Sequence, residues 1–304
     1  MKNSARIAVA GCINRDTVKR PGKPVIRGYG GILYNIFGLA KLLGDRTVIS
    51  PVCNLGNDVS KLVLKLLSSL NNIDPAFIRI VATPNNHCMM KYRDDGERDE
   101  VFTGFVPAIS YSQLQNVIDH DLALINFISG RDMTLGTLRR FRDAFSGGIY
   151  LDFHTLSLGL RCNGKRFLRK PKRWREYIAC CDYLQMNGIE FTLLSGLQPE
   201  RESLVNFFKS CVRPAGSVMV VTLGSNGAAM VWQVNGEIKV RFATPIHASE
   251  VNDTTGAGDL FAAGFCAGLV IGKSLITCLK LAVDTGAYGC SIIHPQDVNL
   301  SRLI

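Results

Sequence analysis

The sequence has no long apolar run and no metal-binding pattern among its cysteines and histidines. No stretch reaches the roughly 20 apolar residues of a membrane-spanning helix without a charge or a helix breaker, so we expect no membrane partner. The ten cysteines form no C-x-x-C motif, and the five histidines lack zinc-finger or H-E-x-x-H spacing. No secretory leader is visible, so we expect reduced thiols and a cytoplasmic protein.

Acidic residues are fewer than basic ones, 25 against 35, which gives a net charge of +10. Such an excess suits an anionic partner: a nucleotide, a phosphorylated substrate or a nucleic acid. A nucleic-acid binder needs a basic face interleaved with aromatic side chains. Only segment 161–175, which contains Phe167 and Trp174, approaches this pattern. We therefore expect a small-molecule partner rather than a nucleic acid.

Short β-rich runs alternate with helix-like segments along the 304 residues. This alternation predicts a three-layer α/β/α sandwich with a central, mostly parallel sheet in a single domain, residues 1–304. Hydrophobic residues make up 47% of the chain, which is enough for a large core. We expect strands at 6–12, 47–53, 122–127, 149–153, 183–186 and 218–223, and helices at 32–43, 59–70 and 275–290.

Two dipeptides predict β-hairpins, because they supply the positive φ angles of a tight turn. They are Asp95-Gly96 and Asn235-Gly236. The first hairpin is polar at its tip and is predicted to project from the main sheet. Together with the preceding segment it forms a small β lid, over approximately residues 14–30 and 86–106.

The stretch "EVNDTTGAGDLFAAGFCAGL", residues 250–269, changes from polar and small residues to a long apolar run. It predicts a tight loop that leads into a buried helix. Unpaired N–H groups and a partial positive charge make such a helix N-terminus an anion site. Asp259 in its first turn has two interpretations. It complements the helix dipole, or it accepts a proton from an attacking hydroxyl beside a bound phosphate.

The segment "DTTGAGD" resembles the second signature of the ribokinase-like (PfkB) carbohydrate kinases. Five further segments resemble motifs of that family in the same order along the chain. They are "GCINRDTV", "GGILYNIFGLAKLLG", "NLGNDVSKLVLKLL", "MNGIE" and "VVTLGSNGAAMVW". A loose P-loop pattern at 267–274 is set aside, because it follows a predicted helix rather than a strand.

The resemblance implies a catalytic machinery. Asp259 is the expected base, and the backbone N–H groups of Gly256, Ala257 and Gly258 are expected to stabilise the transferring phosphoryl group. Asn187 and Glu190 are expected to organise Mg²⁺ and its waters, with Glu190 acting through water. Without the resemblance, this pair reads as an ordinary helix start.

Further residues match the nucleotide, cation and acceptor positions of the family. Thr222, Gly224 and Gly227 are expected along ATP, although they also suit a turn between strands. Asp253 and Thr255 match positions that hold a monovalent cation such as K⁺ in some members. The residues expected to bind sugar hydroxyls are Asn14, Asp16, Gly31 and Asn35.

The sequence also departs from the family pattern. The lid segment 15–29 is short, and in "DFHTLSL" His154 and Leu156 stand where Asn and Arg are usual, while Asp152 is retained. In the family, this arginine is expected to contact an anion. In this chain the contact is either lost or supplied by Arg161, Lys165 or Arg166 of the basic run that follows. Run 161–175 is either a solvated surface or a basic rim that attracts ATP or an anionic substrate.

The expected function is ATP-dependent transfer of a γ-phosphate to a hydroxyl of a carbohydrate, and we expect this hydroxyl to be a primary one. Two alternatives stay open: a nucleoside kinase of the same family, and a catalytically silent relative that only binds nucleotide or sugar. A homodimer that pairs through its lids also stays open, although a shortened lid disfavours it.

Overall fold

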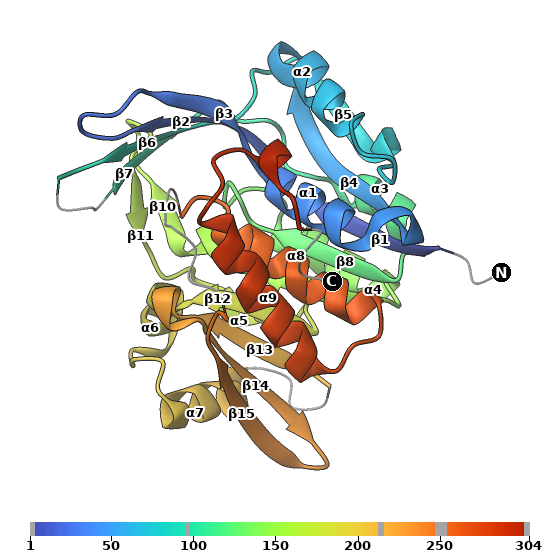
Figure 1. The fold of residues 1–304 in the computed structure, drawn as a ribbon, viewed down its shortest axis with the longest axis vertical. Coiled ribbons are helices and arrows are strands. Elements are labelled where there is room, and N and C mark those ends of the chain that lie inside the picture. Colours follow the sequence, from blue (N-terminus) through green and yellow to red (C-terminus); the bar gives the residue numbers. More distant parts are fainter. Residues whose placement is uncertain (1–3, 95–97, 212–215, 247–253, 301–304) are drawn as a thin grey trace.

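The computed structural model describes residues 4–94, 98–211, 216–246 and 254–300. Its centre is a nine-stranded sheet with the order β15-β14-β13-β12-β9-β8-β1-β4-β5 (Figure 1). Neighbouring strands pair in parallel from β13 to β5, whereas β14 and β15 are antiparallel. The strands are β1 (Ala5–Ala10), β4 (Thr47–Gly56), β5 (Ile78–Val81), β8 (Leu122–Asn126), β9 (Gly148–Asp152), β12 (Tyr183–Asn187), β13 (Val218–Thr222), β14 (Ala228–Val234) and β15 (Glu237–Ala243).

Helices cover both faces of this sheet, because alternate strand residues feed two separate hydrophobic cores. Ile7 and Val9 of β1 join one core, and Ala8 and Ala10 join the other. The first core is closed by α1 (Ile32–Leu43), α2 (Asn57–Leu67), α8 (Ala257–Val270) and α9 (Leu275–Gly289). The second is closed by α3 (Tyr111–Leu114), α4 (Leu135–Ala144), α5 (Trp174–Ile178), α6 (Gly188–Ser195) and α7 (Arg201–Cys211). The predicted α/β/α sandwich is therefore confirmed.

A second sheet of four strands, with the order β3-β2-β6-β7, projects from the side of the sandwich (Figure 1). Its strands are β2 (Ile13–Lys19), β3 (Ile26–Gly31), β6 (His87–Tyr92) and β7 (Arg98–Thr103). Both segments that were predicted to form a lid contribute to it. The predicted turn at Asp95-Gly96 includes residues outside the described part of the chain. The other predicted turn is present, with φ of 51° at Asn235 and 82° at Gly236.

A short hairpin that was not predicted from the sequence follows the central strand β9 along the chain. It consists of β10 (Leu158–Leu160) and β11 (Arg166–Leu168), which pair antiparallel. The Phe102 amide of β7 donates to the Gly164 carbonyl at 2.8 Å. The hairpin therefore links the middle of the sandwich to the outer strand of the small sheet.

Helix α8 lies against α1 at very close range because both helices carry small residues at the contact. A Cβ on Gly38 of α1 would lie 2.8 Å from Ala263 and from Leu260 of α8. Gly31 precedes α1 and Gly256 precedes α8, both with positive φ.

Ser274 caps α9 and accepts from the Thr277 amide, so 267–274 is a helix junction. No helix in the described part of the chain is long and apolar enough to cross a membrane.

Candidate active site

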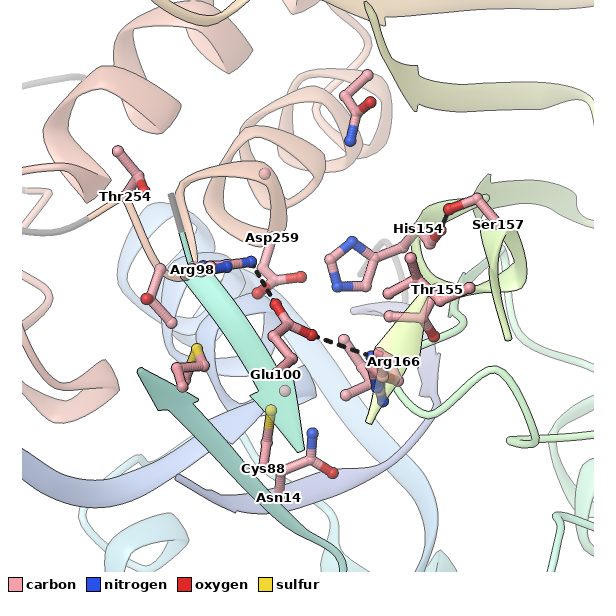
Figure 2. A pocket seen from close by; sticks show the side chains of 18 of the residues that line it. Asn14, Cys88, Arg98, Glu100, His154, Thr155, Ser157, Arg166, Thr254 and Asp259 are labelled. Carbon is pink, nitrogen blue, oxygen red and sulfur yellow. Dashed lines mark hydrogen bonds and ion pairs between the residues drawn. The ribbon is translucent and has the colours of Figure 1, made fainter. Parts of the chain in front are cut away.

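The carboxyl ends of the central parallel strands bring polar residues together beside the N-terminus of α8. Asn126 ends β8, Asp152 ends β9 and Asn187 ends β12, and Thr222 pairs with Asn187 in the neighbouring strand. In an open α/β sheet this edge is where ligands bind. A cavity of about 590 Å³ opens here, and residues of the main sheet, the small sheet and the β10–β11 hairpin line it (Figure 2).

The start of α8 requires a glycine at position 256 and leaves open space beside Gly258. Gly256 has a φ of 82°, and a Cβ there would lie 2.6 Å from the Tyr34 ring. For a Cβ on Gly258 the nearest atom is 3.8 Å away, in the Gln185 side chain. Gly256, Gly258 and Asp259 line the cavity, whereas Ala257 lies in the same first turn outside its lining. The turn therefore offers backbone N–H groups and one carboxylate at a single place.

The Asp259 carboxylate is almost buried, at 7% exposure. Burial raises its pKa from 3.8 to about 6, and a hydrogen bond from Asn126 opposes this rise. Asn126 Nδ2 donates to Asp259 Oδ1 at 2.7 Å. A carboxylate with a pKa near neutrality suits a general base better than an ordinary one. Asn126 was not predicted as a site residue, because nothing in the sequence links it to a residue 133 positions away.

Asn35 is placed differently from the sequence expectation. It is fully buried in α1 and does not line the cavity. Its Nδ2 donates to the Asp259 carbonyl at 2.7 Å, and its Oδ1 accepts from Asn126 at 3.0 Å. Because two of its polar atoms are engaged in this way, Asn35 fixes the first turn of α8 and orients Asn126.

Asn14, Asp16 and Gly31 line the side of the cavity formed by the small sheet. The Asn14 Oδ1 atom is buried and has no hydrogen-bond partner among the described residues. Burial raises the pKa of Asp16 to about 8, and the negative charges of Asp259 and Glu100 add to the rise. A buried acceptor without a hydrogen-bond partner destabilises the folded protein. The Asn14 Oδ1 atom is therefore suited to accept a hydrogen bond from a bound polar ligand.

Four further cavity residues were not predicted to act together: Arg98, Glu100, His154 and Arg166. Glu100 lies between the two guanidinium groups (Figure 2), 2.8 Å from Arg98 and 3.7 Å from Arg166. Burial and the arginine charges lower the pKa of His154 to about 4. His154 is therefore neutral at physiological pH, and its φ of 35° is unusual for a residue with a side chain.

Asn187 and Glu190 face each other at the start of α6. Asn187 N and Nδ2 donate to the two Glu190 carboxylate oxygens at 2.9 and 2.8 Å, and Glu190 N donates back to Asn187 Oδ1 at 2.9 Å. Both residues line the cavity. Burial raises the pKa of Glu190 to about 8. The pair forms a capping box that stabilises the N-terminus of α6. This structural role does not depend on metal binding.

Thr222, Gly224 and Gly227 lie at the carboxyl end of β13, outside the main cavity. Gly224 and Gly227 have φ of 60° and 79°, and a Cβ on Gly227 would collide with the Ala243 carbonyl. A second cavity of about 250 Å³ lies between the end of β15 and α9. Its lining is Arg241, Phe242, Ala243, Thr244, Ile246, Ile276, Leu279, Lys280 and Asp284.

Two residues were expected to hold a monovalent cation. Thr255 lines the main cavity, and Asp253 lies outside the described residues. In the described part of the chain, no group of three or more His, Cys, Asp or Glu side chains is arranged to hold a metal ion.

Comparison with known proteins shows which sequences this chain resembles. The model of the pfkB family of carbohydrate kinases matches residues 164–296. The chain is 25% identical over 269 residues to an ATP-dependent 6-phosphofructokinase of Thermoanaerobacterium thermosaccharolyticum. The match covers 86% of this chain and 78% of that protein. It is 22% identical over 293 residues to a cytidine kinase of Thermococcus kodakarensis, covering 91% and 93%. These matches support a ribokinase-like PfkB carbohydrate kinase.

The solved structures agree with the family assignment at the level of the fold. Ribokinase of Arabidopsis thaliana, complexed with ribose and ATP, superposes with a TM-score of 0.74 at 21% identity, covering 99% of this chain and 98% of that one. The resemblance read from "DTTGAGD" is therefore confirmed. The PfkB relatives above are kinases of different acceptors, so family membership by itself does not identify the acceptor.

Proposed function

We propose that this protein transfers the γ-phosphate of ATP to a hydroxyl group, expected to be a primary one, of a sugar or sugar-like alcohol. One observation carries the proposal: Asp259, at the N-terminus of α8, lines the same cavity as Asn14 and Asp16. A base, an anion-binding helix end and polar groups suited to hydroxyls thus share one cavity. The kinase relatives support the same activity.

In the proposed reaction, the Asp259 carboxylate accepts the proton of the attacking hydroxyl. Its pKa of about 6 keeps it mostly ionised at neutral pH, while burial leaves it more basic than an exposed aspartate. Asn126 holds the carboxylate in place by donating to Oδ1. A well-placed general base contributes about 10²–10⁴-fold to the rate.

The first turn of α8 stabilises the charge on the phosphoryl group. The amides of Gly256, Ala257 and Gly258 belong to the end of the helix where N–H groups have no partner in the helix, although the Ala257 amide donates to the Thr254 carbonyl at 3.3 Å. Their alignment is fixed before the reaction begins, so no reorganisation is needed as charge develops. The small side chains allow close approach to the backbone.

The side-chain oxygens of Asn187 and Glu190 are suited to bind Mg²⁺ through an intervening water molecule. Carboxylate and amide oxygens are the hard ligands that this ion prefers, and Glu190 lines the cavity. Since both of its oxygens already accept from Asn187, Glu190 would orient water ligands rather than replace them. When bound, Mg²⁺ neutralises phosphate charge. Its requirement, and that of K⁺, stay predictions.

The remaining site residues are assigned to ATP and to closure. Thr222, Gly224 and Gly227 follow the strand next to Asn187 and lead toward the second cavity, which we assign to the nucleotide base. The small sheet acts as the lid, because β2 brings Asn14 and Asp16 to the cavity wall. A lid of this kind excludes water from the transferring group.

A nucleoside acceptor is the second candidate, and the rim of the cavity favours it. Phe167, Leu168 and Ile189 line the cavity and are exposed large apolar residues. A nucleobase presents an apolar face that suits such a rim, whereas a small sugar presents mainly hydroxyl groups. The cytidine kinase relative supports this candidate as well.

An acceptor screen tests the proposal. ADP release would be followed with Mg-ATP over sugars, sugar acids, sugar phosphates and nucleosides, with and without K⁺. We expect at least one acceptor to stimulate ADP release above the rate with water alone. Saturable ATP or sugar binding with no turnover on any acceptor would identify a silent relative and contradict the proposal.

A further inference from the structure

Arg166 is a nearly buried arginine whose side chain reaches into the main cavity. It lies on β11 and is 6% exposed. Its Nη2 donates to the Ile128 carbonyl at 3.2 Å, and the guanidinium lies 4.3 Å from the centre of the Phe102 ring. A guanidinium carries five N–H donors, so most of the donors of Arg166 remain available to a ligand.

Arg98 faces the same carboxylate from the small sheet. Its Nη2 lies 2.8 Å from Glu100 Oε1, while the closest approach of Arg166 to Glu100 is 3.7 Å, beyond hydrogen-bonding distance. Figure 2 shows Glu100 between the two guanidinium groups. One carboxylate therefore serves two arginines, and the stronger contact belongs to Arg98.

Among the described residues, no other acidic side chain that lines the cavity forms an ion pair with these two guanidinium groups. Asp99, which also lines the cavity, pairs with Lys165 at 2.8 Å. The pKa of Asp16 is raised to about 8, mainly by burial, so this side chain is largely protonated at neutral pH. Glu190 is held by Asn187 on the donor side, and Asp259 is the proposed base.

We propose that Arg166, together with Arg98, binds an anionic group of the acceptor, a carboxylate or a phosphate, separate from the hydroxyl that reacts. The inference rests on the proposed kinase function and names its substrate class: a sugar acid or a sugar phosphate. Arginine binds such groups through paired N–H donors, with charge-assisted hydrogen bonds.

The β10–β11 hairpin explains how this chain places an arginine there. Leu156 is buried where the family pattern has arginine. Of the three basic residues that could compensate, Arg161 stacks on Phe167 and Lys165 pairs with Asp99. Arg166 is the one of these three that lines the cavity. The hairpin turns the chain back so that a residue ten positions later fills the role.

Binding of the acceptor without ATP tests the inference independently of turnover. Isothermal titration calorimetry would compare fructose, fructose 6-phosphate, glucose and gluconate on the intact protein and on Arg166→Gln. We expect tighter binding of an anionic member than of its uncharged partner. Loss of charge-assisted bonds worth about 1.5–3 kcal/mol predicts about 10- to 100-fold weaker binding of the anionic ligand to the variant, with the uncharged ligand unaffected.

Arg169→Gln is the matched control, because Arg169 lies in the same basic segment, is exposed and does not line the cavity. It should bind every ligand as the intact protein does. Should Arg166→Gln fail to fold, Arg98→Gln provides the same comparison from the small sheet.

Two outcomes overturn the inference: no preference for either anionic ligand, or equal loss of affinity for charged and uncharged ligands in Arg166→Gln. Phosphate and carboxylate are distinguished by which member of the panel binds. The kinase proposal fails separately, if an anionic ligand binds in the predicted way but is never phosphorylated.

Discussion

Asn126 lowers the pKa of the proposed base against the effect of burial, and Asn126→Ala tests this directly. The donor lies 2.7 Å from Asp259 Oδ1 and lowers the pKa of that carboxylate, which burial otherwise raises. A hydrogen bond to a charged group contributes about 1.5–3 kcal/mol, and one pKa unit corresponds to about 1.4 kcal/mol. Removing the donor should therefore raise the pKa of Asp259 by about one to two units above its value of about 6.

The assay is the pH dependence of kcat/KM, which reports the ionisation of the free enzyme. The intact protein should lose activity as the pH falls through about 6. In the variant the acid limb should move up, with a loss of about 5- to 50-fold at pH 6 and recovery toward pH 9. Asn54→Ala is the control, because Asn54 is also buried but donates to Pro107 and Ala108 instead. An acid limb that does not move would refute the reasoning.

Two further predictions concern the acceptor wall and the helix start. The pKa of Asp16 is raised from 3.8 to about 8 in the folded protein, so the folded state binds more protons across this window and loses stability as pH rises through it. Asp16→Asn should remove this pH-dependent loss of stability. The difference in Tm between the unliganded variant and the intact protein should therefore increase from pH 5 to pH 8.5. A difference in Tm that stays constant with pH would contradict this prediction. Gly256→Ala should abolish turnover and lower the Tm, because its φ of 82° and the Tyr34 ring leave no place for a Cβ; wild-type kcat would contradict this.

The layers of the fold were predictable because they depend on local patterns. Residues 32–43 were predicted as a helix, and α1 has these bounds. The buried runs at 122–127 and 218–223 became β8 and β13 within one residue. Continuous apolar runs with breakers on both sides identify central strands without any knowledge of their partners.

The site was only partly predictable because its contacts are long-range. Asp259 was identified from its position after Gly-Ala-Gly, but its partner Asn126 is an ordinary asparagine at the end of a strand. Asn35 was expected at the acceptor and instead supports α8. The strands of the β10–β11 hairpin have three residues each, too short for any periodicity, so the sequence left open how segment 161–175 is used.

The most direct measurement of the central claim is the turnover of Asp259→Asn on whichever acceptor the screen identifies. The amide keeps the size of the side chain but has no basic carboxylate to accept the hydroxyl proton. We predict a loss of about 10²–10⁴-fold in kcat, with the Kd for ATP largely unchanged. A kcat within a few-fold of the intact protein, in a variant that is folded and binds ATP, would contradict the assignment of Asp259 as the base.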